Sequence, residues 1–214
     1  TITGTSERSV TYGNNNTAVT TAGVESTAST RGQEDVYIGY VSLFGEAHLF
    51  DSGLRVGLSY VPYALESETT ENVRNDLCAG GEVVASATCT TTTNKVSVDL
   101  EDLMSMYVAY HHDLDLPFVS SVFIKAGIIE ADVITGESLA SGSQYGNTSL
   151  AGDFFGIGFE KNLEEEGMFI RLEGAVTEFD SIKLVSTNSG SNTHTIDITG
   201  MDGSTATISI GKTF

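Results

Sequence analysis

The last ten residues, 205–214, read Thr-Ala-Thr-Ile-Ser-Ile-Gly-Lys-Thr-Phe, and they decide the fold class. The apolar residues Ala206, Ile208, Ile210 and Phe214 share one parity, while Thr, Ser and Gly occupy the positions between them. A period of two predicts a β-strand with one apolar and one polar face. The apolar face of such a strand covers a core in a soluble protein and meets lipid in a membrane barrel. The stretch fits both kinds of β protein, so the remaining sequence must distinguish a soluble protein from a membrane barrel.

Bulk composition narrows the classes of protein. The chain has 214 residues and a mean hydropathy of zero, and no apolar run approaches the roughly 20 residues that a membrane helix needs. This excludes a helical membrane protein but not a β-barrel, whose strands carry apolar residues only at every second position. The chain has 10 Lys and Arg against 29 Asp and Glu. Nucleic acid is excluded as a partner, because phosphate binding needs a basic surface.

Seven long segments alternate like strands, and their connections are short and long in turn. Only Asp102 and Leu103 break the pattern of the third segment. Long strands with alternating short and long connections predict an all-β fold, an antiparallel up-and-down transmembrane β-barrel of about eight strands. A soluble sandwich would have shorter strands and no fixed alternation of loops. The predicted strands are 36–50, 54–64, 95–110, 118–135, 150–160, 168–185 and 194–214.

The same pattern divides the chain into an extracellular loop and a barrel. Residues 1–33 are rich in Thr, Ser, Asn and Gly and are predicted to form a polar extracellular loop. Residues 34–214 are predicted to form the barrel, with extracellular loops near 66–94, 136–149 and 186–193.

With these features the chain resembles the small OmpA-like bacterial outer-membrane barrels of eight strands. The resemblance covers roughly residues 36–214 as a pattern of strands and turns that ends on Phe214. It implies location in the bacterial cell outer membrane, contact with outer-membrane lipid and lipopolysaccharide, and recognition of the terminal Phe as a signal by the barrel assembly machinery. Lys212 departs from the family, which usually has an aromatic or apolar residue at the third position from the end. A Lys near the interface can extend its amine outward. The net charge of −19 means that contact with an anionic surface would need bridging divalent cations.

Charged residues on the polar parity predict a network inside the barrel. Small barrels fill their interior with side chains, and buried charges need partners. We expect a salt-bridged plug that holds the barrel closed, in preference to a gated pathway for ions. The predicted network consists of Glu46, Arg55, Asp99, Glu101, Lys125, Glu160, Arg171 and Glu173.

The cysteines and histidines point to no catalytic chemistry. Cys78 and Cys89 are the only cysteines and lack zinc-site neighbours, so a disulfide within an extracellular loop is predicted. The four histidines are scattered, and nothing in the spacing around His194 marks a nucleophile. No enzyme activity, cofactor or metal is expected.

Strand count leads to a further expectation. A closed barrel with an even number of strands needs one strand more than the seven predicted. We therefore expect a first strand running outward before Thr1, or closure of the gap by residues 1–12. The first option is preferred, because 1–12 has no usable apolar face.

Three functions remain open at this point. The first is an outer-membrane barrel with a structural or surface-exposed role. The second is a narrow pore for ions or small solutes. The third is a soluble, secreted β-sandwich that serves as an adhesin or assembly subunit.

Overall fold

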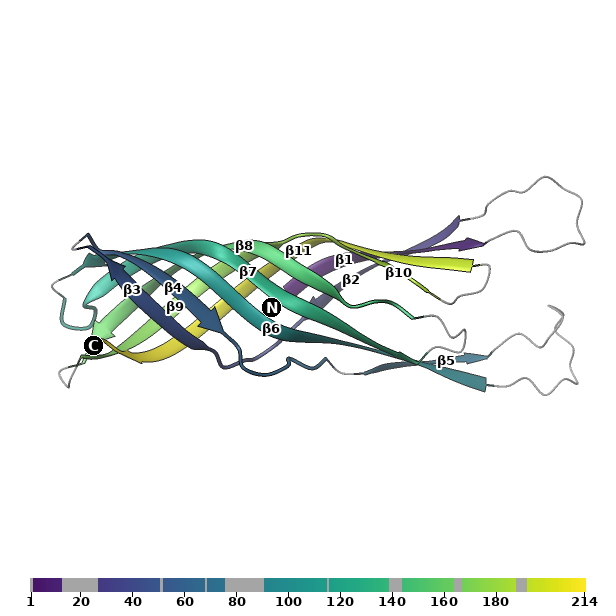
Figure 1. Cartoon of the computed structure of the whole chain (residues 1–214), viewed down its shortest axis with the longest axis horizontal. Helices are drawn as coiled ribbons and strands as arrows, with labels where there is room; N and C mark the ends of the chain where they lie inside the picture. The colour runs from purple at the N-terminus through teal and green to yellow at the C-terminus, as the bar shows by residue number, and fades with distance from the viewer. Residues whose placement is uncertain are drawn as a thin grey trace, which may run out of the picture.

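The structure, a computed structural model, consists of strands (Figure 1). It describes residues 2–12, 27–50, 52–67, 69–75, 91–114, 116–138, 144–163, 167–187 and 192–214. Among these residues no helix is long and apolar enough to cross a membrane. The strands are β1 (Ile2–Tyr12), β2 (Thr27–Val36), β3 (Leu43–Leu49), β4 (Leu54–Tyr60), β5 (Thr70–Asn75), β6 (Thr91–Asp113), β7 (Ser121–Ser138), β8 (Thr148–Asn162), β9 (Met168–Phe179), β10 (Ile182–Val185) and β11 (Asn192–Lys212).

All eleven strands belong to one antiparallel sheet. Its order is β2-β1-β11-β9-β8-β7-β6-β4-β3, with β10 paired to β11 and β5 paired to β6. Figure 1 shows this sheet curled about its long axis. The sheet is not closed into a barrel: β2 and β3 are its edges, and no pairing among the described residues joins them. The all-β, antiparallel prediction is thus confirmed at the level of the sheet.

Alternation along the strands separates the two faces of the sheet as predicted. Every apolar residue expected to face outward is exposed, and every residue expected on the opposite face is buried or half-buried. The outward set is Leu54, Val56, Leu58, Tyr60, Met104, Met106, Val108, Ile124, Ala126, Phe155, Ile157, Phe159, Ile170, Leu172, Ile208 and Ile210, and the inward set is Ser59, Ser105, Lys125, Gly158, Arg171 and Ser209. Exposed aliphatic side chains on the convex face and buried polar ones on the concave face are the reverse of a soluble protein.

The short connections between β3 and β4, β6 and β7, and β8 and β9 join strand ends that lie at the end of the sheet that holds the C-terminus (Figure 1). Gly53 and Gly167 have φ of 75° and 76° in two of these turns, a conformation that favours glycine. The three short connections are therefore confirmed, and much of each predicted long connection lies outside the described residues.

The segment 1–33 differs from its prediction as a polar loop. It contains β1 and most of β2, which pair with each other, and β1 also pairs with β11. The sequences of β1 and β2 show no apolar alternation, so hydrophobic periodicity gave no signal for this hairpin. Residues 1–12 do not close the gap beside the end of β11, because β1 meets β11 only between 192 and 203.

The predicted strand boundaries also change. Residues 37–42 are not strand, so the first predicted segment is divided between β2 and β3. Strands β6, β7, β8 and β11 reach into the segments predicted as loops at 66–94, 136–149 and 186–193. The interruption at Asp102 is real: the pairing of β6 with β7 shifts register between Glu101 and Met104, and Asp102 has φ of 50°.

Apolar side chains fill the concave face on the long-loop side. Val133, Leu150, Ile182, Leu184 and Met201 form a buried cluster there. The prediction of a polar interior therefore holds only for the half near the short turns. In the loop-side half β7, β8, β10 and β11 carry aliphatic residues on the inward parity, so burial there follows ordinary hydrophobic packing.

Candidate functional site

The charged residues nearest the short turns meet on the concave face in a group that we call the ion-pair cluster. It comprises Glu46, Arg55, Glu160 and Arg171, which come from β3, β4, β8 and β9. Each lies within a few residues of a short turn, so antiparallel pairing brings the four strands to the same level. Two acids and two bases give the cluster no net charge.

Arg171 is the centre of the ion-pair cluster. Its Nη1 and Nη2 donate to the two carboxylate oxygens of Glu46 at 2.7 and 2.9 Å, a bidentate pair. Its Nη2 and Nε also donate to Glu160 at 2.8 and 3.2 Å. The side chains of Arg171, Glu46 and Glu160 are only 3%, 7% and 4% exposed. These contacts are therefore screened little by solvent.

The pair between Arg171 and Glu46 also connects distant parts of the sheet. Glu46 lies on the edge strand β3, and β4, β6, β7 and β8 separate that strand from β9 in the sheet order. The ring of Phe44 contacts that of Phe169 across the same space, with centroids 6.2 Å apart. These contacts hold the edge strand against the opposite wall and so maintain the curl.

Two further groups extend the ion-pair cluster. Arg55 lies farther from the acids, with its Nη1 3.4 Å from Glu46 and 3.5 Å from Glu160. The hydroxyl of Tyr107 donates to Glu46 at 2.8 Å. One carboxylate, Glu46, thus accepts from three different strands.

A separate ion pair lies beside the cluster. The Nζ of Lys125 is 2.5 Å from Glu173, and it also lies 4.5 Å from the centre of the Tyr107 ring. This second pair is likewise electroneutral. It continues the row of paired charges along the concave face towards the loops.

Aromatic rings surround the guanidinium of Arg171. The rings of Phe44, Phe123 and Phe169 lie 5.4, 4.9 and 5.2 Å from its central carbon. These distances are within the range of cation–π attraction. Together with the carboxylates, the rings exclude open space around the charge.

The structure brings six of the eight residues of the predicted network together in ion pairs, and the other two lie apart. Asp99 is half-buried and accepts from the backbone amide of Ser67 at 3.2 Å, away from the cluster. Glu101 is exposed, so the prediction that it points inward is wrong. Glu101 lies at the bulge between Glu101 and Met104, where inward and outward side chains stop alternating: Leu100 is half-buried, whereas Glu101 and Asp102 are both exposed.

Sequence reasoning missed the aromatic members of the site. Phe123, Phe169 and Tyr107 share the parity of Lys125 and Arg171, so large rings at polar-parity positions were the available signal. Small neighbours make room for the rings: a Cβ at Gly158 would lie 2.3 Å from the Phe123 ring.

The remaining predicted residues lie at the margins or outside the described part of the chain. Phe214 is fully exposed at the short-turn end, with the Nζ of Lys212 5.7 Å from its ring centre. Cys78 and Cys89 lie outside the described residues. Among the described residues no group of three or more His, Cys, Asp or Glu is arranged to hold a metal ion.

The geometry of the cluster favours obstruction over transport. A pathway for ions needs charged groups with spare hydrogen-bonding capacity along open space. Here each acid is bonded to a base of opposite charge. Comparison with known proteins adds nothing to this description, because no protein-family model, curated protein or solved structure matches the chain.

Proposed function

We propose that this chain is a small bacterial outer-membrane β-barrel, of the OmpA-like kind, with a structural or surface-exposed role and a plugged interior. The observation that carries the proposal is the inverted polarity of the sheet. Ile157 and Leu172 on the convex face are 55% and 53% exposed, whereas Arg171 and Glu160 on the concave face are 2% and 4% exposed. A bilayer accepts such apolar side chains, and a secreted sandwich would bury them.

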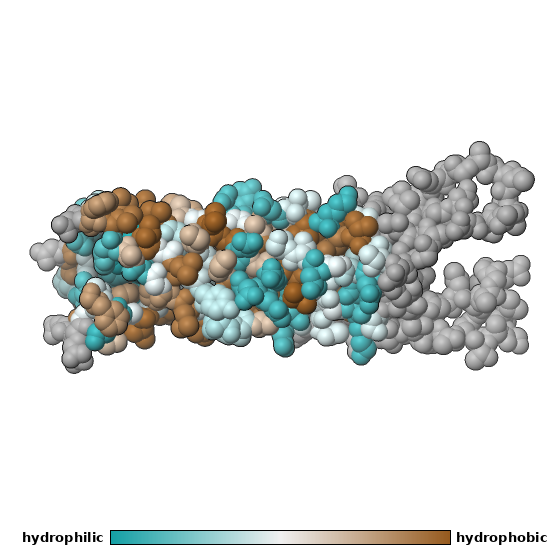
Figure 2. Space-filling model, in the orientation of Figure 1, coloured by the Kyte–Doolittle hydropathy of each residue, from teal (hydrophilic) through white to brown (hydrophobic). Residues whose placement is uncertain are grey.

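The height of the apolar surface supports a membrane location. Along β9 the outward aliphatics lie between Met168 and Glu178. From Ile170 to Val176, six residue steps of about 3.3 Å at a tilt of about 40° cover roughly 15 Å, which fits within the roughly 25 Å apolar band of outer-membrane barrels. Figure 2 shows hydrophobic residues gathered towards the short-turn end and hydrophilic residues farther along. Phe50, Phe118 and Phe214 are exposed at the short turns, where an aromatic girdle would meet the membrane interface.

An acidic row supports contact with lipopolysaccharide through divalent cations. Asp153, Glu178 and Asp202 are exposed and lie directly opposite one another on β8, β9 and β11. Like charges at this spacing repel unless cations neutralise them. The row lies at the loop-side boundary of the apolar surface, the level at which anionic headgroups would lie. At that level Mg²⁺ or Ca²⁺ would bridge the carboxylates to lipid phosphates.

The ion-pair cluster supports a plug over the second candidate, a narrow pore. The cluster is electroneutral, nearly dry and bonded across the interior from β3 to β9. We expect no stable conductance from the protein in planar bilayers. The same conductance measurement on the Arg171→Met variant, which lacks the central cation, is a more sensitive test.

The test of the proposal is the solvent in which the chain folds. Urea-unfolded protein is diluted into buffer, into detergent micelles and into phospholipid vesicles, and the folded fraction is read from far-UV circular dichroism and from vesicle flotation. A barrel should fold and float only with detergent or lipid. Folding to a monomer in plain buffer would support a secreted soluble protein and would overturn the proposal. Stable single-channel steps with the wild-type protein would show that the interior is a conducting pore and is not plugged.

A matched pair of variants makes the vesicle measurement specific. Leu172→Arg places a charge in the apolar surface, and Glu178→Arg places the same charge at the acidic row on the same strand. Only the first should reduce the floated fraction. Equal effects would mean that the apolar surface does not enter lipid.

A further inference from the structure

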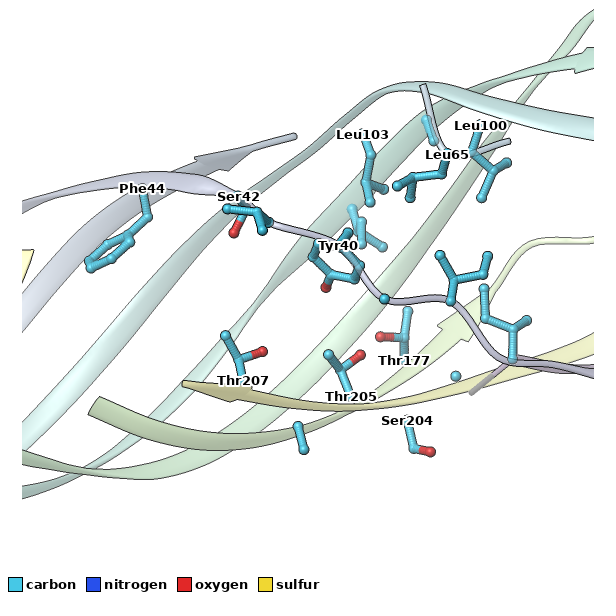
Figure 3. Close-up of a pocket in the computed structure, with 18 of the residues that line it drawn as sticks. Tyr40, Ser42, Phe44, Leu65, Leu100, Leu103, Thr177, Ser204, Thr205 and Thr207 are labelled. Carbon is cyan, nitrogen blue, oxygen red and sulfur yellow. The ribbon is translucent and has the colours of Figure 1, made fainter. Parts of the chain in front are cut away.

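The curled sheet has an open seam between β11 and the segment that leads into β3. Residues 204–212 of β11 pair only with β9, and β3 pairs only with β4. A cavity of about 560 Å³ lies in the seam, bordered by 38–44 on one side and 203–210 on the other (Figure 3). Both borders run in the same direction, towards the short turns. A strand placed between them would therefore be antiparallel to both.

The solvent exposure of side chains along the seam indicates that its two edges have no adjacent strand. Val41, Leu43, Ile208 and Ile210 border it and are 71%, 66%, 76% and 66% exposed. Every other exposed Val, Leu, Ile or Met among the described residues is at most 60% exposed. In a sheet each outward side chain is partly covered by those on the adjacent strands. The four highest values therefore mark the two edges that have no adjacent strand.

The width of the seam follows from β1. This strand lies between β2 and β11, and Ile2 is opposite both Val36 and Gly203. Immediately beyond Ile2 the same two flanks continue as 37–44 and 204–211 with nothing paired between them. The seam is therefore one strand wide, about 9.6 Å between its edges.

The two edges are also in phase. Continuing the register of Ile2 by one residue at a time sets Ile208 opposite Val41 and Ile210 opposite Leu43, and all four side chains are outward. The same count sets Ser209 opposite Ser42 and Gly211 opposite Phe44, and all four positions are half-buried on the inner side. A strand in line with β1 would thus meet outward neighbours on both sides at one position and inward neighbours on both sides at the next. Tyr40 and Thr205, one from each edge, both line the cavity between the two edges.

We propose that the seam is the binding site of one β-strand of about eight residues that continues the line of β1 past Ile2, antiparallel to β11 and to 37–44. Its pattern is set by the flanks. We number the positions of this strand backwards from Thr1, so that position 1 adjoins Thr1. Even positions then fall between outward residues and take aliphatic side chains. Odd positions fall between Thr207 and Tyr40 or between Ser209 and Ser42, and take small polar ones. Occupation would close the sheet and satisfy backbone groups that lipid cannot satisfy.

The proposal rests on the proposed membrane location for its driving force, and its test separates the two. Three proteins are refolded in micelles: the chain as it is, the chain with eight alternating residues fused to Thr1 (Val at even positions, Ser at odd), and the chain with the same residues shifted by one position. Amide hydrogen exchange is measured across 204–212, with 168–176 of β9 as the internal reference. The matched extension should slow exchange of the β11 amides that face the seam by about tenfold or more, and the shifted extension should leave it unchanged.

Each other outcome overturns the proposal in a defined way. Absence of protection with the matched extension would show that the seam does not take a strand. Equal protection by both extensions would refute the phase argument. Protection by the same eight residues added as a free peptide, at equimolar concentration, would show that the seam binds a separate polypeptide and does not require a strand in line with β1. Vesicle flotation of the unextended chain reports on the membrane location independently, so either claim can fail alone.

Discussion

Replacing Arg171 with Met tests the ion-pair cluster most severely. The variant removes the cation that two carboxylates share at 2.7–2.9 Å. It leaves Arg55, at 3.4–3.5 Å, as the cation nearest to Glu46 and Glu160, and Glu46 keeps the hydrogen bond from Tyr107. The charge of the four-residue cluster changes from zero to −1. Because the side chains involved are 3–7% exposed, water screens little of this charge. Breaking a buried pair by removing one partner costs about 3–5 kcal/mol, a large part of the roughly 5–15 kcal/mol that stabilises a domain.

Arg55→Met is the matched control. Arg55 carries the same charge and contacts the same two acids, but at longer distances and with a side chain that is 14% exposed. Its loss should cost about 1 kcal/mol. The double variant Arg171→Met with Glu46→Gln should recover part of the loss, because one of the two stranded carboxylates is then neutral.

The assay is the free energy of unfolding in urea for protein refolded in phospholipid vesicles, with the folded fraction read by tryptophan-free methods such as circular dichroism, since the chain has no Trp. A loss below about 1 kcal/mol for Arg171→Met, or a loss equal to that of Arg55→Met, would refute the reasoning that Arg171 is the centre of the cluster.

Two further variants probe the faces of the sheet. Gly158→Ala should destabilise the fold by about 1–3 kcal/mol, because the new Cβ would lie 2.3 Å from the Phe123 ring and would displace that ring from Arg171. In the control variant Gly174→Ala the new Cβ has nothing within 4 Å, so this variant should be neutral or slightly stabilising. Equal urea midpoints for the two variants would contradict this packing. Removal of Mg²⁺ and Ca²⁺ with a chelator should release wild-type protein from lipopolysaccharide-containing vesicles more readily than from phospholipid vesicles. Glu178→Gln should reduce this difference in release. Identical release of the wild-type protein from both kinds of vesicle would show that the acidic row does not contact headgroups.

The sequence predicted the strands that alternate and missed the ones that do not. Ile208 and Ile210 in β11, or Ile170 and Leu172 in β9, reveal a strand because one face is apolar throughout. Strands β1 and β2 have few aliphatic residues, so their sequences carry no apolar alternation. Hydrophobic patterning detects a strand only where burial or lipid contact selects its side chains.

The ion-pair cluster could be predicted as a set of inward charges, but its pairing could not. Parity alone placed Arg171, Glu160 and Glu46 on one face, yet only the curl of the sheet brings β3 to β9. Glu101 was misassigned because it adjoins a bulge at which inward and outward side chains stop alternating, and the sequence shows this break only at Asp102 and Leu103. The apolar loop-side interior was missed because only polar residues were expected inside, whereas Val133 and Leu150 are buried there.

The most direct test of the central claim is the environment of consecutive residues along β9 in a bilayer. Spin labels at 169–176, one per protein, are examined in vesicles for collision with oxygen, which concentrates in lipid, and with a water-soluble nickel complex. The account predicts oxygen access that alternates with a period of two, with maxima at Ile170, Leu172, Gly174 and Val176 and minima at Arg171 and Glu173. Labels at Leu172 that collide mainly with the nickel complex, or access without alternation, would contradict it.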